Sequence, residues 1–129
     1  MERLKERLAI ARRAFQTLDE ILTKPVTPEI RDASIQRFEY TYEALWKSAA
    51  FFLREIHGVE APSPKTVIRS AREVGLLGDA EARAAIALVN DRNLTVHTYN
   101  EDLAQQIYGR LRGHARLMDR WLGRMESQV

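Results

Sequence analysis

The sequence contains no cysteine, and this absence removes several classes of function at once. Without a thiol the chain can form no disulfide, no thiolate metal site and no cysteine nucleophile. Its three histidines are scattered along the chain and do not make a zinc site. We therefore expect a protein of the cytoplasm, with no metal site and no cofactor.

Long apolar runs are also missing, and none approaches the ~20 residues that span a bilayer. The first residues, Met1 to Arg7, alternate in charge where a secretory signal is apolar. The net charge is only +2, although sixteen arginines stand against four lysines. We expect a soluble protein without a membrane partner, and the overall charge does not by itself indicate a nucleic-acid binder.

The chain shows no convincing strand pattern, internal repeat or glycine-rich phosphate loop. Its apolar residues instead recur at steps of three and four, which is typical of amphipathic helices. The pattern predicts four long helices and a short one, at residues 4–22, 28–57, 64–74, 79–92 and 101–125. We expect an all-α fold in one domain over residues 1–129, an antiparallel up-and-down four-helix bundle with one additional short helix.

Local signals mark the helix ends. Thr27 followed by proline is typical of a helix start, and Gly58 and Gly75 are placed to end helices in a left-handed conformation. Asp79 is the expected N-cap of the fourth segment, and Asn100 that of the last.

The helix expected at 28–57 is apolar around more of its circumference than one bundle core uses. Aromatic residues outside its main stripe include Tyr40, Trp46 and Phe51. A second subunit covers them in one interpretation, which predicts a homodimer. In the other, a short additional helix covers them.

Asp91 to Tyr99 is the one dense cluster of reactive side chains. Arg92 can hold a phosphate through two hydrogen bonds, and His97 can exchange a proton near neutral pH. In one unbroken helix these two side chains would lie roughly 140° apart around the axis, and they could not converge on one ligand. If both residues act on the same phosphate, the helix must break between them. Asn93 either orients this pair or caps the helix, and we favour capping slightly.

Two further groups have competing interpretations. His114 falls in the apolar stripe of the last helix; pairing with Arg110 would make it functional, but a structural role is the simpler interpretation, as it is for His57 near a helix end. Four arginines at intervals of four form either an RNA-binding line or a solvated face relieved by acids of neighbouring helices: Arg112, Arg116, Arg120 and Arg124.

Two segments together resemble a known family. Arg37 to Lys47 and Asp91 to Tyr99, with its Arg-x4-His-x-Tyr motif, are similar to the HEPN superfamily, in its HepT-like group of nucleotidyltransferase substrate-binding proteins. The resemblance implies a helical bundle that dimerises, with the motifs of two subunits facing a shared cleft. It also implies a separately encoded partner, a minimal nucleotidyltransferase.

The same resemblance implies a function in two versions. In the first, the protein is a toxin and a metal-independent RNase that cleaves RNA with Arg92 and His97, and the partner is an antitoxin that transfers AMP to Tyr99. In the second, it is a non-catalytic adaptor that presents substrate to the nucleotidyltransferase. An intact motif alone does not decide between them.

Overall fold

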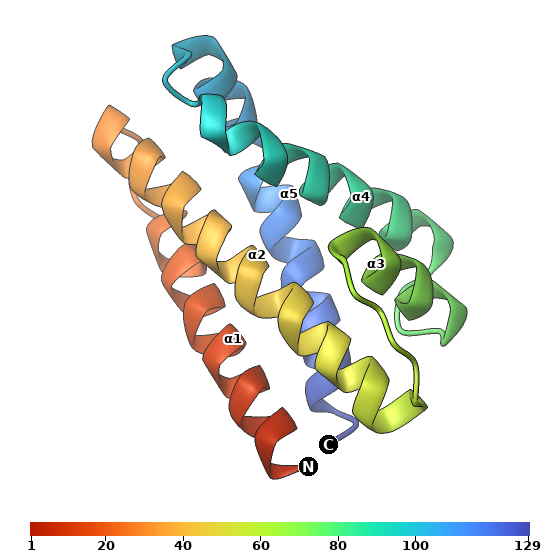
Figure 1. Cartoon of the computed structure of the whole chain (residues 1–129). Helices are drawn as coiled ribbons and strands as arrows, with labels where there is room; N and C mark the ends of the chain where they lie inside the picture. The colour runs from red at the N-terminus through yellow and green to blue at the C-terminus, as the bar shows by residue number, and fades with distance from the viewer.

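The computed structural model describes all 129 residues, and its regular structure is entirely helical. The helices are α1 (Glu2–Ile21), α2 (Pro28–His57), α3 (Pro64–Glu73), α4 (Asp79–Leu94), the short 3₁₀ helix η1 (Thr95–His97) and α5 (Glu101–Glu126). The long helices run alternately up and down, and both termini lie at the same end of the bundle (Figure 1). The predicted all-α bundle with one additional short helix is confirmed.

Most of the predicted helix ends are where the turn residues place them. Thr27 accepts a hydrogen bond from the backbone of Ile30 at 3.1 Å, and proline follows it at the first helical position. Gly58 and Gly75 have φ of 67° and 80°, in the left-handed region that suits glycine. α1 ends slightly early, because Leu22 is already its C-cap.

One predicted cap was wrong. Gly78, not Asp79, is the N-cap of α4, and Asp79 is the first helical residue. Glu81 accepts the backbone N–H of Gly78 at 2.9 Å, so a side chain from the first turn satisfies the cap from inside the helix.

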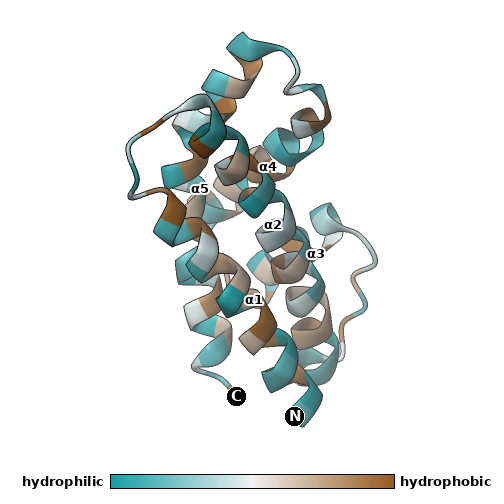
Figure 2. Cartoon of the chain, turned by 90° about the vertical axis from the view of Figure 1, so that its left-hand side faces the viewer, coloured by the Kyte–Doolittle hydropathy of each residue, from teal (hydrophilic) through white to brown (hydrophobic).

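A single cluster of buried apolar residues fills the centre of the bundle. Apolar and polar stretches alternate along α1 and α5 on the face shown in Figure 2, as amphipathic packing requires. α3 takes part in covering the second apolar side of α2: Pro64 and Ile68 line a crevice with Tyr42 and Trp46. The short helix therefore accounts for part of the excess apolar surface of α2.

One other α2 aromatic, Phe51, is covered by cations. The ring of Phe51 lies under the guanidinium groups of Arg7 and Arg54, 4.7 and 4.9 Å from the ring centre.

No helix of the chain is both long and apolar enough to cross a membrane.

Candidate functional site

The residues of the reactive cluster lie where α4 passes through η1 into α5, at the end of the bundle away from the termini (Figure 1). The predicted helix break between Arg92 and His97 is present, because α4 ends at Leu94 and a 3₁₀ turn follows. The Thr95 hydroxyl lies 2.7 Å from the carbonyl of Arg92 and satisfies it as the helix ends. Asn100 then caps α5 through the N–H of Leu103 at 3.1 Å, as predicted.

Arg92 is held against α2. Its Nη1 donates to the Thr95 hydroxyl at 3.0 Å and lies 3.6 Å from a carboxylate oxygen of Glu39. The Thr95 hydroxyl is also 2.8 Å from that same oxygen, so threonine, arginine and glutamate form one small network. The Arg92 Nε is buried without a partner, and the side chain is 25% exposed. The guanidinium therefore retains hydrogen-bonding capacity that the chain does not use.

His97 and Tyr99 form a separate, exposed pair. The imidazole Nδ1 lies 3.2 Å from the Tyr99 hydroxyl, and the two rings meet edge to face with their centres 5.9 Å apart. Tyr99 is 85% exposed, so its ring does not pack against the start of α5. Within one chain Arg92 and His97 share no hydrogen bond, and each has its own partners.

Asn93 does not cap α4. It lies in the last turn, exposed and without a side-chain hydrogen bond, and Thr95 is the C-cap residue. Neither the capping role nor a bond that orients Arg92 or His97 is present.

A buried ionic cluster beside Arg92 was missed by the sequence analysis. Asp91 accepts two hydrogen bonds of 2.8 Å from Arg110 and one of 2.7 Å involving Nε2 of His114. Burial raises the pKa of Asp91, but the hydrogen bonds from Arg110 and His114 outweigh this effect and leave the pKa below its ordinary value. His114 also stacks on Phe38 with ring centres 5.5 Å apart. The spacing of Arg110 and His114, one helical turn apart, was the signal that could have revealed their common partner.

Comparison with known proteins assigns the chain to a family. Residues 6–127 match the family described as nucleotidyltransferase substrate binding protein like. The chain belongs to this family. A curated relative, the probable ribonuclease HepT of Haemophilus influenzae, is 30% identical over 82 residues, which are 60% of this chain and 55% of that protein. The chain thus matches about half the length of that relative.

Two solved structures are similar to this member of the nucleotidyltransferase substrate binding protein like family. A protein of Thermus thermophilus is 57% identical with a TM-score of 0.86, over 89% of this chain and 98% of that one. A Haemophilus influenzae protein is described as revealing the fold of a substrate binding domain of a nucleotidyltransferase. It is 23% identical with a TM-score of 0.78, over 92% of this chain and 98% of that one, and it supports the fold.

In this family member the four arginines of α5 do not form one open line, because each step of four residues turns about 40° further around the axis. Arg112 donates to the carbonyl of Leu22 at 2.6 Å, whereas Arg124 donates to both oxygens of Glu81 at 2.6 and 2.8 Å. Arg120 also reaches Glu81 at 3.3 Å, and only Arg116 makes no hydrogen bond or ion pair. Glu81 lies about 17 Å along α4 from Arg92. The four arginines therefore face different neighbours, from the end of α1 at Arg112 to the start of α4 at Arg124.

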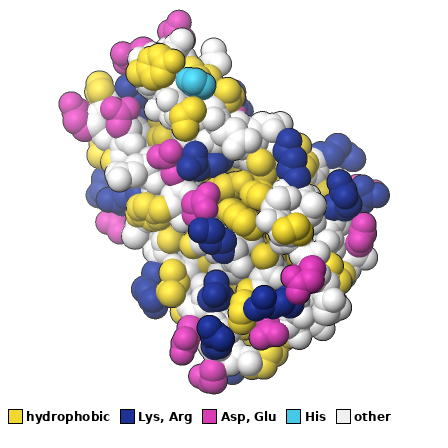
Figure 3. Space-filling model, viewed as in Figure 1, with side chains coloured by type: hydrophobic (Ala, Val, Ile, Leu, Met, Phe, Trp, Pro, Cys, Tyr) yellow, Lys and Arg dark blue, Asp and Glu magenta, His cyan; other side chains and the backbone are white.

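An apolar surface lies between α2, α3 and α4 at the middle of the view in Figure 3, and we call it the central face. Its crevice is lined by Tyr42, Trp46, Pro64, Ile68 and Val89, with Trp121 below. The indole nitrogens of Trp46 and Trp121 are buried without an acceptor. Burial raises the pKa of Tyr42 to about 12.

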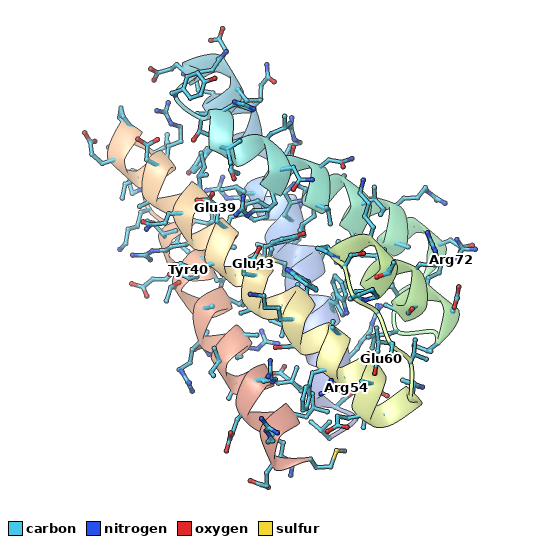
Figure 4. The ribbon with its side chains drawn as sticks, in the orientation of Figure 1. Glu39, Tyr40, Glu43, Arg54, Glu60 and Arg72 are labelled. Carbon is cyan, nitrogen blue, oxygen red and sulfur yellow. The ribbon has the colours of Figure 1, made fainter.

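Charged residues border the central face. Glu39 and Glu43 lie on the side of α2 nearest α4, whereas Tyr40 lies on the side nearest α1 (Figure 4). Glu43 pairs with Lys47 at 3.4 Å, and Glu39 faces Arg92. The border thus carries both signs of charge, and it includes the arginine of the reactive cluster.

Proposed function

We propose that the protein is a HepT-like toxin, a metal-independent endoribonuclease that a partner nucleotidyltransferase silences by AMP transfer. The observation that carries this proposal is the exposed His97–Tyr99 pair at the end of α4, one turn beyond Arg92. Family membership and the similarity to a probable ribonuclease HepT support it. In this role residues 1–129 act as one domain in the cytoplasm, where RNA and ATP are available.

The chemistry requires a proton acceptor and an anion-binding group. His97 takes the proton of an RNA 2′-hydroxyl, and the 2′-oxygen attacks the adjacent phosphorus. The bond from phosphorus to the 5′-oxygen breaks, and the leaving 5′-oxygen takes up a proton from the protonated His97 or from water, which gives a 2′,3′-cyclic phosphate and a 5′-hydroxyl. Arg92 donates from Nη2, which makes no hydrogen bond within the chain, to the phosphate oxygens as negative charge builds there.

A homodimer completes this site in our proposal. Arg92 faces α2 while His97 lies exposed at the end of the bundle, and within one chain they share no hydrogen bond. Docking two copies through the central face would bring two Arg92 side chains to one cleft, and its mixed border of charge suits self-complementary contact. Two copies of Arg92 and His97 would then surround one RNA strand.

Silencing follows from where AMP would be attached. The Tyr99 hydroxyl attacks the α-phosphate of ATP bound to the partner, and pyrophosphate leaves. The modified oxygen is the one that lies 3.2 Å from His97 Nδ1. A bulky group with negative charge would then occupy the position that the RNA phosphate needs.

The comparisons also support a second candidate function, that of a substrate-binding adaptor. The family description and the Haemophilus influenzae structure both refer to substrate binding for a nucleotidyltransferase. In that version the protein is a non-catalytic adaptor, and the central face is its docking surface.

Incubation of the purified protein with RNA separates the two functions. We expect cleavage that EDTA does not change, and a fall of at least about a hundredfold in His97→Ala and in Arg92→Ala, because each loses a group that acts on the reacting atoms. His57→Ala and Arg13→Ala are the matched controls, since both side chains are exposed and remote from η1. The nuclease proposal is contradicted if the protein does not cleave RNA, if a chelator abolishes cleavage, or if His97→Ala keeps full activity. The adaptor function would then be the better interpretation.

A further inference from the structure

A second basic feature lies between α3 and α4, away from the proposed catalytic cluster. It is a groove of about 470 Å³ with an apolar floor, and four cations surround it. Lys65, Arg69 and Arg72 come from α3, and Arg83 comes from α4. Dark blue side chains gather over these two helices at the right of Figure 3, and Arg72 lies at this edge in Figure 4.

The positive charge of this groove is largely uncompensated. Its only acid is Asp79, which pairs with Arg72 at 3.0 Å. Lys65, Arg69 and Arg83 make no ion pair or hydrogen bond with the protein, and all three are exposed. The α5 arginines differ, because three of the four already donate to Glu81 or to a backbone carbonyl. The cations free to bind an anion are therefore concentrated in the groove more than along α5.

Along α4 itself, no exposed acidic residue lies between the groove and the end of the helix. From Arg83 to His97 the only acidic residue is Asp91, and it is buried and bonded to Arg110 and His114. Asn90 and Asn93 are exposed, and their side chains lie within about 80° of Arg83 around the axis of α4. Arg83 lies about 17 Å along α4 from its end at Leu94. A phosphate backbone that follows this side meets amides and no carboxylate.

We propose that the α3–α4 groove binds the backbone of single-stranded RNA and leads the strand along α4 to His97. This inference rests on the proposed ribonuclease function and names where the substrate is held. The cations bind phosphates and the apolar floor accepts sugars and base edges, but the groove offers no aromatic platform. Binding should therefore depend on salt and show little sequence preference.

The test measures RNA binding separately from cleavage. The binding protein is the full chain with His97→Ala, and the probe is a fluorescein-labelled oligouridylate followed by fluorescence anisotropy over a range of salt concentrations. The groove variant adds three neutral substitutions: Lys65→Gln, Arg69→Gln and Arg83→Gln. The control variant removes the same charge from exposed, unpaired cations of α1: Arg3→Gln, Lys5→Gln and Arg13→Gln.

We expect the groove variant to weaken binding at least tenfold at moderate salt. Its plot of log K against log salt should become shallower by about 2, because each lost phosphate contact contributes about 0.7. The α1 control should change affinity less than threefold. With His97 intact, the groove variant should raise KM at least tenfold and keep kcat within twofold. Equal effects of the groove and α1 variants, or a larger effect of Arg112→Gln with Arg116→Gln, would overturn the groove assignment.

The two proposals fail in different ways. Groove-dependent RNA binding without cleavage by the wild-type protein would contradict the nuclease and leave the groove standing. Cleavage that depends on His97 but does not change in the groove variant would support the nuclease and contradict the groove assignment. If the groove variant binds RNA normally and loses its nucleotidyltransferase partner, the groove is a protein interface and the RNA assignment is wrong. Retained far-UV circular dichroism and thermal midpoint establish that each variant is folded.

Discussion

Two consecutive residues attach the end of α4 to different neighbours. Asp91 is bonded to Arg110 and His114 of α5, and Arg92 faces Glu39 of α2. A buried carboxylate with three hydrogen bonds is costly to leave unpaired, so Asp91 fixes the backbone next to Arg92. Asp91 and Glu39 thereby hold the Arg92 guanidinium between α5 and α2.

Tyr99 carries the residue-scale prediction. Tyr99→Phe loses the hydroxyl that would accept AMP and the hydrogen bond to His97. An exposed hydrogen bond contributes about 1 kcal/mol, so RNA cleavage should fall by less than about tenfold. The variant should escape silencing when the cognate nucleotidyltransferase, ATP and Mg²⁺ are added, whereas the wild type should be silenced.

Mass spectrometry supplies the control for this prediction. Tyr40→Phe removes another exposed tyrosine, one whose hydroxyl bonds to Thr17 on the α1 side of α2. It should still gain one AMP, and Tyr99→Phe should gain none. AMP on the Tyr99→Phe protein would show that another residue is the acceptor.

At the scale of the elements, Glu81 joins the start of α4 to the end of α5. It accepts two hydrogen bonds from Arg124 and one from the backbone of Gly78. The Arg124 guanidinium, with the Gly78 N–H, lowers the pKa of Glu81 from its ordinary 4.5 to about 2. Because the pKa is lowered on folding, the stabilisation is present above about pH 4.5 and is lost as the pH falls towards 2.

Glu81→Gln should therefore reduce the free energy of unfolding at pH 7 and have a smaller effect at pH 3. The loss at pH 7 is expected to be about 1 to 2 kcal/mol, since charge-assisted hydrogen bonds at a partly exposed site are lost. Urea unfolding at both pH values measures the difference. Glu60→Gln, at an exposed acid without an ion pair, should change neither value. An equal loss at pH 7 and pH 3 would contradict the assigned role of the Glu81 charge.

The same elements show how far the sequence predicts this structure. Ends set by local chemistry, such as Thr27, Gly58 and Asn100, were predictable because each cap depends on residues within one turn. The break before His97 was predictable from β-branched residues followed by a cap. Gly78 was missed because its cap comes from Glu81, whose side chain turns back along the chain.

Long-range pairing was beyond the sequence. Arg124 is hydrogen-bonded to Glu81, which is 43 residues away in the sequence, and His114 to Asp91, which is 23 residues away. The line of α5 arginines could therefore be recognised from the sequence, but not that most of it is already bonded. The excess apolar surface of α2 was visible as well, whereas its partial cover by α3 required the packed structure.

At the scale of the whole molecule, the central face carries the prediction of a homodimer. It combines the apolar crevice with a border of both charge signs. Trp46 is half-buried at the edge of the crevice, so a second copy docked there would bury its remaining exposed apolar surface. We therefore expect a dimer by sedimentation velocity at micromolar concentration.

Trp46→Glu tests whether the dimer uses this face, since it places a charge inside the contact. The dissociation constant should rise at least about a hundredfold, because a buried unpaired charge costs several kcal/mol. Glu43→Arg provides a second variant that leaves the crevice packing intact, and it should weaken the dimer by disturbing the charged border. Val26→Glu places the same charge on an exposed apolar residue of the α1–α2 turn and should leave the dimer unchanged. A wild-type monomer, or dimers of undiminished affinity in both central-face variants, would remove the composite site and leave each chain with Arg92 and His97 bonded to separate partners.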